Sequence, residues 1–587
     1  MKYCVFLNEF TLLRTLVLIL LGRPVYLIPS RLFFAPLAGP FARIGAWLEK
    51  RANVGSVFDI MPDTRKYWDI LFYHNRTDIF AHTEPHINER FGFVGLENWI
   101  GNFAMPFKHA TCKYMSEQFN SVFLLRDISD TFRAGEVAIV HCHDDMLFAY
   151  QAYYGEPPRV RCIGAWQFQP LVNLLSLMLV FAHLVTWLAR VLSWRKADPE
   201  RVFLGADFTG SDPQVQMVRD IVGDPAQCLI VYRNRAQREA SAADVSGFQH
   251  CLNKGGRVAL SQLPGFLGSL VGDGARLYRR ARNLAPDHFL TIAKLLEKKA
   301  AYRALMNRFQ FKYFWCRDDY NPEHILRSQE LREAGAVSLG INHGLTSPLR
   351  IHPNLRYIDY DIYYAFGSHL HRTYYTDTWA RDMKVKPVGS LCMTREYLNQ
   401  VKQPRPRDIV YFVTPGVGEE RMHAAALALA VAFPDKKIFV KINPGEKKRG
   451  TYDAFLKFCD TAPENFIETE EDSYDLMLKA TYAVSGRSTV TAEAIQFGVK
   501  VLSFDFAGLE YPYYYRDFPE LCVQSAEQAI ARISAMEAGT EIYPREKFAD
   551  LIDLSGNYII DVIRTDLNLP PLQSVIDDTP LEKVGLG

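Results

Sequence analysis

"YAVSGRSTVTAEAIQFGVKVLSFD", residues 482–505, is the stretch that decides the fold class. An apolar run stops at Gly486, helix-forming residues follow from Ser488, and Gly498 separates them from a second apolar run. This order of strand, helix and strand is typical of a parallel α/β sheet, in which each strand is followed by a crossover helix. The stretch therefore predicts an α/β fold.

The turn between this first strand and the helix is also the best candidate for a binding site. Gly486, Ser488 and Thr489 place hydroxyl and backbone N–H groups at a helix start, where they can hold an anion. Glu493 lies one turn further along on the same face and could accept a ribose hydroxyl. The structural alternative is a capping box, in which the same hydroxyl and acidic groups only close the helix end.

The same alternation extends through the chain on both sides of this stretch. We predict strands at residues 3–7, 24–28, 121–125, 137–142, 159–164, 201–206, 228–233, 407–413 and 436–442. We predict helices at residues 11–20, 287–309, 423–433, 474–480 and 547–567. A proline-rich basic segment, residues 401–408, is expected to lead into the first strand of the last series.

This pattern predicts an α/β protein with two doubly wound Rossmann-type domains that face a central crevice. The first domain is expected at residues 1–350, with insertions, and the second at residues 351–545. A C-terminal helix and tail are expected at residues 546–587. Ligands of open α/β sheets bind beyond the carboxyl ends of the strands, so polar residues at those ends are the candidates for function.

Composition narrows the function classes. Lys and Arg number 67 against 66 Asp and Glu, which gives a net charge of +1 and no global field to hold a nucleic acid. The 10 cysteines are scattered without the spacing of a zinc site, which predicts free thiols in a reducing cytoplasm. We therefore expect a cytoplasmic protein with no metal centre and no nucleic-acid partner.

An apolar segment at residues 171–194 leaves three alternatives open, one of which is a helix that spans the membrane. It is apolar over about the length of a membrane span, but Asn173, His183 and Arg190 interrupt it, and Trp194 ends it beside basic residues. It could be a buried helix, or a helix at the membrane surface, with the protein held peripherally at the inner face of the cytoplasmic membrane.

Two clusters of polar residues follow predicted strands of the first domain. Asp144 comes after the strand at residues 137–142, and Asp318 follows a strand that ends at Cys316. Either carboxylate could remove a proton from an acceptor hydroxyl if it reaches hydrogen-bond distance. The neighbouring Asp319 is expected to cap the helix that follows.

Two loops of the second domain could contact a phosphate group. Gly416 lies in a glycine turn between a strand and a helix, although such turns are common. Lys441 ends the next strand, Asn443 follows it, and a basic run at residues 447–449 adds positive charge. A solvated basic loop is the alternative for residues 447–449.

Taken together, "GINHG" (340–344), "VKINPGE" (440–446) and "SGRSTVTAEAIQFGVKVLSFD" (485–505) resemble GT-B glycosyltransferases of the bacterial surface-polysaccharide type. That group includes capsule Kdo transferases, polysialyltransferases and teichoic-acid polymerases. The sequence departs from its pattern at Asn342, where Gln is usual, and at Asn443, where His is usual. The resemblance implies that His343 sits between the domains and faces the donor, and that glycine beside it lets the backbone come close.

The resemblance implies a metal-independent glycosyltransferase with no tightly bound cofactor. Its substrates would be a nucleotide-sugar donor, linked to CMP, CDP, UDP or GDP, and a surface-polysaccharide or lipid-linked glycan acceptor. We expect Asp318, His343 and Asp144 as catalytic candidates. The expected donor contacts are Gly416, Lys441, Asn443, Gly486, Ser488, Thr489 and Glu493. The alternatives are a sugar-nucleotide epimerase or hydrolase of GT-B fold, and a non-catalytic polysaccharide-assembly subunit.

Overall fold

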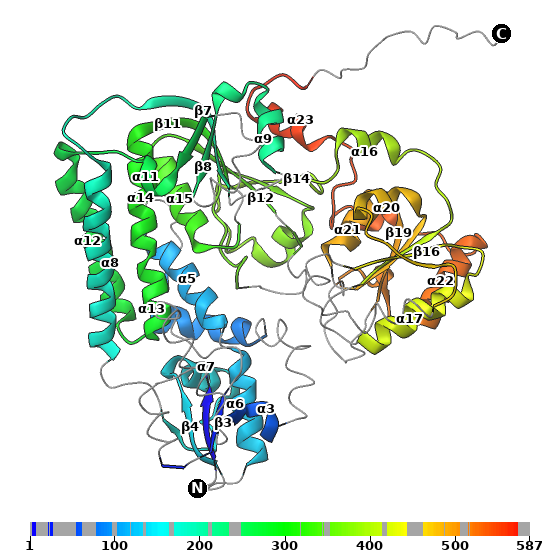
Figure 1. The fold of residues 1–587 in the computed structure, drawn as a ribbon, viewed down its shortest axis with the longest axis horizontal. Coiled ribbons are helices and arrows are strands. Elements are labelled where there is room, and N and C mark those ends of the chain that lie inside the picture. Colours follow the sequence, from blue (N-terminus) through cyan, green and yellow to red (C-terminus); the bar gives the residue numbers. More distant parts are fainter. Residues whose placement is uncertain are drawn as a thin grey trace.

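The computed structural model covers most of the chain. It describes residues 3–7, 21–22, 24–27, 54–61, 78–96, 103–117, 119–132, 137–163, 169–208, 214–233, 248–316, 319–342, 344–345, 353–413, 419–442, 462–486, 488–504, 515 and 517–572. Within these ranges the strands form parallel sheets of 5, 7 and 6 strands and a separate ladder of 2 strands, with helices packed around them (Figure 1). The predicted α/β class is confirmed.

The six-stranded sheet contains the stretch that opened the sequence. Its strands are β15 (Ile409–Phe412), β16 (Ile438–Lys441), β17 (Phe466–Glu468), β18 (Tyr482–Ser485), β19 (Lys500–Phe504) and β20 (Cys522–Val523). Their spatial order is β17-β16-β15-β18-β19-β20, and every pair is parallel. This is the doubly wound order of a Rossmann-type unit, which winds outward in both directions from its centre.

Side-chain alternation along these strands fills both faces of the six-stranded sheet. Ile409 and Tyr411 belong to the core with α17 (Glu419–Ala432) and α22 (Ala526–Glu537). Val410 and Phe412 belong to the opposite core with α20 (Ser473–Lys479) and α21 (Thr489–Gln496). Because successive side chains of a strand point to opposite faces, apolar residues at every position require helices on both faces.

The seven-stranded sheet has the same winding with one further strand. Its strands are β7 (Glu200–Phe208), β8 (Cys228–Tyr232), β9 (Phe248–Cys251), β11 (Phe309–Cys316), β12 (Val337–Ile341), β13 (Ile362–Ala365) and β14 (Lys384–Pro387). Their order is β14-β13-β12-β11-β7-β8-β9, all parallel. β13 and β14 follow residue 350, where a domain boundary is predicted, yet they extend this sheet. Sequence alternation cannot say which of two similar sheets a strand joins.

Helices from distant parts of the chain cover the seven-stranded sheet. One face packs against α14 (Leu295–Arg308) and α15 (Pro322–Glu333). The other packs against α9 (Gln214–Val222) and the C-terminal helix α23 (Ile559–Asp566), which returns from the six-stranded unit (Figure 1). The Tyr364 hydroxyl donates to Asp566 at 2.9 Å, and Arg564 Nη1 donates to the carbonyl of Ile221 at 2.6 Å. These bonds tie the two units together through the end of the chain.

The N-terminal part forms a third, five-stranded sheet, which the sequence prediction did not separate from the first domain. Its strands are β1 (Tyr3–Leu7), β2 (Val25–Leu27), β3 (Val54–Ser56), β4 (Val137–Cys142) and β5 (Cys162–Ile163), in the order β3-β2-β1-β4-β5. Helices α3 (Val57–Ile60), α5 (Ala104–Ser116), α6 (Asn120–Thr131) and α7 (Asp144–Tyr154) accompany it. The predicted helix at residues 11–20 lies outside the described residues.

Three element predictions are wrong in type or extent. The helix predicted at residues 547–567 is a short 3-10 helix (Arg545–Phe548) and α23, with irregular chain between them. The run at residues 121–125 lies in α6 and is not a strand, because a short apolar run fits either structure and tertiary packing decides. The single helix predicted at residues 287–309 is two helices, α13 (Pro286–Ala293) and α14, which meet at Lys294.

The apolar segment near residue 180 is α8 (Gln169–Val191), which packs beside α12 (Leu263–Ala281), α13 and α14 (Figure 1). Short elements complete this region: β6 (Leu192–Ser193) pairs with β10 (Val258–Ala259), and α11 (Leu252–Gly255) precedes β10. Among the described residues, α8 is the one helix long and apolar enough to cross a membrane by length and composition, and 28% of its apolar window is buried.

Candidate functional site

The winding of the two larger sheets locates the places where a ligand can bind. In each sheet the first and fourth strands along the chain are neighbours, and the order in which strands are added reverses between them. Ligands of open α/β sheets bind at the carboxyl ends of the strands beside that reversal. The reversal lies between β15 and β18 in the six-stranded sheet and between β7 and β11 in the seven-stranded sheet. We call these two places the six-strand switch point and the seven-strand switch point.

At the six-strand switch point, hydroxyl groups hold the turn that leads into α21. The carbonyl oxygen of Gly486 accepts hydrogen bonds from Thr491 Oγ1 and Ser503 Oγ, both at 3.3 Å. Ser488 is the N-cap of α21, and its Oγ accepts from the backbone N–H of Val490 at 3.4 Å. Ser488 and Thr489 are themselves partly exposed. These hydrogen bonds hold the helix start in place.

The end of β12 in the seven-stranded sheet meets this helix start. The backbone N–H of Leu345 donates to Thr489 Oγ1 at 3.0 Å, and Asn342 Oδ1 accepts from the N–H of Gly344 at 2.9 Å. A Cβ atom on Gly344 would lie 3.2 Å from Thr489 Oγ1, tighter than ordinary contact. Glycine therefore allows the close approach between the two units that the sequence led us to expect at this position.

Glu493 joins the two units from the second turn of α21. Its Oε1 accepts from Ser390 Oγ at 2.7 Å and from the Tyr474 hydroxyl at 3.2 Å. Burial raises the pKa of this carboxyl group above its ordinary value, and the two hydrogen bonds oppose that shift. Both hydrogen bonds are accepted by Oε1, which therefore connects α21 to Ser390 and Tyr474. Glu493 does not form the capping box that the sequence left as an alternative, because it is the fifth residue after the N-cap Ser488 and a capping box uses the third.

A second pair of contacts beside Glu493 requires glycine. Gly389 has a φ of +77°, and a Cβ atom there would lie 1.9 Å from Nε2 of Gln496. The N–H of Ser390 donates to Gln496 Oε1 at 2.9 Å. The loop after β14 thus lies directly on α21, and a larger residue at position 389 would be strained by its φ and would displace the amide group of Gln496.

Lys441 ends β16 and is buried. Its Nζ donates to the carbonyl oxygen of Glu470 at 2.9 Å. This bond places the Lys441 side chain at the carboxyl edge of the six-stranded sheet.

Several predicted site residues cannot be placed. Asp318, His343, Gly416 and Asn443 lie outside the described residues. Asp144 is described. It is the exposed first residue of α7, which follows β4 in the unit of the five-stranded sheet. The structure therefore brings Gly486, Ser488, Thr489 and Glu493 together at one helix start, with Lys441 ending β16 of the same sheet, and places Asp144 in another unit.

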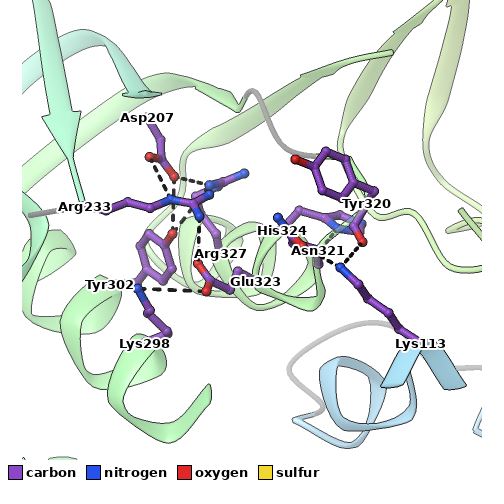
Figure 2. Close-up of polar contacts among 10 residues, drawn as sticks. All are labelled: Lys113, Asp207, Arg233, Lys298, Tyr302, Tyr320, Asn321, Glu323, His324 and Arg327. Atoms are coloured by element: carbon purple, nitrogen blue, oxygen red, sulfur yellow. Dashed lines mark hydrogen bonds and ion pairs between the residues drawn. The ribbon is translucent and has the colours of Figure 1, made fainter. Parts of the chain in front are cut away.

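The seven-strand switch point holds a buried charge cluster that sequence reasoning missed (Figure 2). Asp207 is the second-last residue of β7, and its Oδ2 accepts from Arg327 of α15 and from the Tyr302 hydroxyl of α14, the latter at 3.3 Å. Arg327 is 0% exposed and Asp207 3% exposed. Arg327 Nε also donates to Cys316 Sγ at 3.1 Å, and burial raises the pKa of that thiol to about 12. These groups lie at the carboxyl ends of β7 and β11.

The cluster continues toward the surface at the start of α15. Arg233, which follows β8, lies 3.8 Å from Asp207 and 3.7 Å from Glu323. Lys298 of α14 lies 3.9 Å from the other oxygen of Glu323 (Figure 2). Charges of opposite sign alternate through the cluster, as desolvated ionic groups require.

A lysine from the five-stranded unit reaches the same helix start. Lys113 Nζ donates to Asn321 Oδ1 at 2.7 Å and to the carbonyl of Tyr320 at 3.3 Å (Figure 2). Asn321 is the N-cap of α15 and makes no side-chain cap bond to that helix. The predicted capping role of Asp319 is wrong: its carboxylate is fully buried and accepts from the Tyr363 hydroxyl at 2.7 Å.

The sequence pattern could have identified part of this charge cluster. Asp207 and Arg233 lie at or directly after the carboxyl ends of apolar strands, the position at which functional residues of parallel sheets collect. Tyr302, Lys298 and Arg327 come from helix interiors, where nothing in the local pattern marks them.

No protein-family model matches the sequence, and no curated protein matches it. Among solved structures, MurG from Acinetobacter baumannii is similar with a TM-score of 0.34 and 10% identity, over 62% of this chain and 100% of that chain. The wall teichoic acid polymerase TagF is similar with a TM-score of 0.36 and 12% identity, over 69% of this chain and 99% of that chain. A UDP-GlcNAc 2-epimerase from Neisseria meningitidis bound to UDP-GlcNAc gives 0.36 and 12%, over 63% and 99%. The strand orders given above, and not these scores, define the fold.

Proposed function

We propose that the chain is a glycosyltransferase that moves a sugar from a nucleotide-sugar donor to a surface-polysaccharide or lipid-linked glycan acceptor. The observation that carries the proposal is the hydrogen bond between the N–H of Leu345 and Thr489 Oγ1. It joins the carboxyl edges of two doubly wound sheets, so that groups from both can reach one ligand. The resemblance of residues 340–344 and 485–505 to GT-B glycosyltransferases supports the same function.

The donor binds at the six-strand switch point in this proposal. The helix start of α21, with the side chains of Ser488 and Thr489, holds the phosphate, and Lys441 adds a positive charge. Glu493 accepts a ribose hydroxyl at Oε2, since its described hydrogen bonds fall on Oε1. Gly416, Gly486 and Asn443 complete the contacts. Helix N–H groups and a lysine supply the charge that a metal ion would otherwise bring to the leaving phosphate.

In the reaction, a carboxylate removes the proton of an acceptor hydroxyl, whose oxygen attacks the anomeric carbon of the donor sugar. The bond from that carbon to the phosphate oxygen breaks, and the nucleotide leaves with the electron pair and its negative charge. Asp318, after β11, is the proposed base, with Asp144 as the second candidate and His343 facing the donor. We place the reaction in the cytoplasm, with the acceptor at the inner face of the cytoplasmic membrane.

Thermal unfolding with CMP, CDP, UDP and GDP tests the donor site, because a ligand that binds the folded state raises the melting temperature. We expect one nucleotide class to stabilise the protein, and we expect Ser488→Ala with Thr489→Ala to abolish that shift. The matched control is Ser525→Ala, which removes the N-cap of α22 in the same unit, where Ser525 Oγ accepts from Gln528 at 3.2 Å. This control should lower stability but keep the nucleotide shift.

The same assays separate the alternatives. A sugar-nucleotide epimerase or hydrolase would consume the donor with no glycan acceptor present, whereas a transferase would need the acceptor. A non-catalytic assembly subunit would show no stabilisation by any of the nucleotides, and that result would overturn the proposed function.

A further inference from the structure

Helix α8 has two unlike sides. Its inner side is buried against α12, α13 and α14 through Leu177, Val180, Leu184, Leu188 and Val191. Asn173 Nδ2 on this side donates to the carbonyls of Arg282 at 2.9 Å and Leu284 at 2.8 Å. A helix held in this way along its whole length cannot cross a bilayer without unpacking the core beneath it.

The outer side of α8 is apolar and exposed. The large exposed hydrophobic residues of this segment are Leu171, Leu174, Leu175, Met178, Leu179, Val185, Leu192 and Trp194. Those within the helix, from Leu171 to Val185, recur at the spacing of one helix face and form a stripe of about 21 Å at ~1.5 Å per residue. The C-terminal half of the helix also exposes His183, Thr186 and Arg190, and Leu192 and Trp194 follow the helix end. Soluble monomers rarely expose a contiguous apolar surface of this kind without a partner.

Basic residues stand at both ends of the stripe. Exposed Arg195 and Lys196 follow Trp194 at the C-terminal end. At the N-terminal end, the last residues of α12 lie beside α8, as the bond from the Tyr278 hydroxyl to the carbonyl of Pro170 at 3.1 Å shows, and they carry exposed Arg279 and Arg282. An apolar stripe between positive ends, with a tryptophan at one end, has the charge and shape of a surface that lies on an anionic bilayer.

The same charges argue against self-association on this face. If two copies paired through the stripe in antiparallel fashion, Arg279 and Arg282 of one copy would face Arg195 and Lys196 of the other. Parallel pairing would bring identical ends together. Either arrangement opposes like charges, whereas anionic lipid headgroups neutralise both ends at once.

We propose that the outer side of α8, with the basic ends formed by Arg195, Lys196, Arg279 and Arg282, docks in the plane of an anionic lipid bilayer. The apolar stripe enters the boundary between headgroups and acyl chains, and the basic residues contact the lipid phosphates. This docking does not depend on the proposed enzymatic activity, and its test measures binding alone.

The test is sedimentation of the full-length chain with vesicles of phosphatidylcholine alone or mixed with phosphatidylglycerol. We expect binding to the mixed vesicles, weaker binding to neutral vesicles, and release by high salt. Leu175→Gln with Leu179→Gln should weaken partitioning by at least ~10-fold, because two large apolar side chains are lost from the contact. Arg195→Gln with Lys196→Gln should weaken binding to the mixed vesicles by roughly 5-fold for each charge.

The matched control replaces exposed apolar residues elsewhere. Val431 and Ile542 are 65% and 88% exposed, comparable with Leu175 at 56% and Leu179 at 63%. Val431→Gln with Ile542→Gln should bind vesicles as the unchanged protein does. Light scattering on all variants measures the oligomeric state in parallel.

Three results would overturn the proposal. The unchanged protein could stay in solution with the mixed vesicles, or the Leu175 and Leu179 variant could sediment as well as the control. The third is a dimer that the Leu175 and Leu179 changes convert to a monomer with no vesicle binding by either form, which would assign the stripe to self-association.

Discussion

The two larger sheets have the same winding but end differently at their switch points. At the carboxyl ends of β7 and β11, ionic groups pair with one another, and Arg327 and Asp207 are almost wholly buried. After β18, the turn into α21 contains Gly486, and Ser488 and Thr489 are partly exposed. The comparison shows that the same strand order can place different groups at the switch point: the residues at the strand ends decide whether these groups are buried and paired with one another or partly exposed.

Mutation at the seven-strand switch point should change the free energy of unfolding more than mutation at the six-strand switch point. Arg327→Met removes one partner of a buried ion pair and leaves Asp207 without its main counter-charge. We expect the free energy of unfolding to fall by ~3–5 kcal/mol, measured by urea denaturation. The matched control is Arg372→Met, which breaks an exposed ion pair with Asp550 and should cost less than ~1 kcal/mol.

A compensating change sharpens this prediction. Asp207→Leu combined with Arg327→Met removes both charges and should recover part of the loss, since a buried ion pair can often be replaced by apolar residues. If Arg327→Met costs no more than the exposed control, the cluster does not hold the seven-strand switch point together, and the contrast between the sheets fails.

The junction between the sheets should respond less strongly. Thr489→Val keeps the shape of the side chain but removes the acceptor for the N–H of Leu345. We expect a loss of ~1–2 kcal/mol in the free energy of unfolding and faster hydrogen exchange at the Leu345 amide. Thr489→Ser keeps the hydroxyl and should restore the slow exchange. Equal exchange rates in the valine and serine variants would show that this hydrogen bond does not join the units in solution.

The smallest effect should be a pH dependence at Glu493. Burial raises the folded-state pKa of this carboxyl group above its unfolded value, so its contribution to stability is fully present below the unfolded pKa and is lost as the pH rises through the folded pKa. Glu493→Gln cannot ionise but can still accept from Ser390 and Tyr474. The variant should therefore melt higher than the unchanged protein at neutral pH, and the difference should shrink toward about pH 4.

The control for this comparison is Glu396→Gln, which removes an exposed carboxylate near the same loop. It separates the release of a buried charge from a general change in net charge. A melting-temperature difference for Glu493→Gln that is the same at every pH would mean that burial of the carboxylate does not set its stability contribution.

Local sequence was a good guide to the elements of the six-stranded sheet. β18, α21 and β19 lie where the stretch at residues 482–505 predicts them, because strand, turn and helix signals agree there. Prediction failed at residues 121–125, where a short apolar run could be strand or helix, and between α13 and α14, where one helical period continues across a break. Hydrophobic periodicity predicts whether a long element is a helix or a strand better than it predicts the residues at which the element begins and ends.

The candidate site also has a part that the sequence predicts and a part that it does not. Ser488, Thr489 and Glu493 are close in sequence, so one helix places them together whatever the rest of the fold does. Their partners Leu345, Ser390 and Tyr474 come from two different units, and no local pattern pairs them. The fit of Gly389 against Gln496 likewise exists only once the loop after β14 lies on α21.

The sequence by itself determined that this is a parallel α/β protein, that α21 begins with hydroxyl residues after a glycine, and that α8 is apolar over its length. Those properties are local, since propensity and periodicity act within a few turns of chain. Only the tertiary structure decided that the described strands divide into sheets of five, seven and six strands and a two-stranded ladder, that α23 returns to the seven-stranded sheet, and that Arg327 meets Asp207. It also decided which side of α8 is exposed. Those are long-range contacts, which arise from packing between segments far apart in the chain.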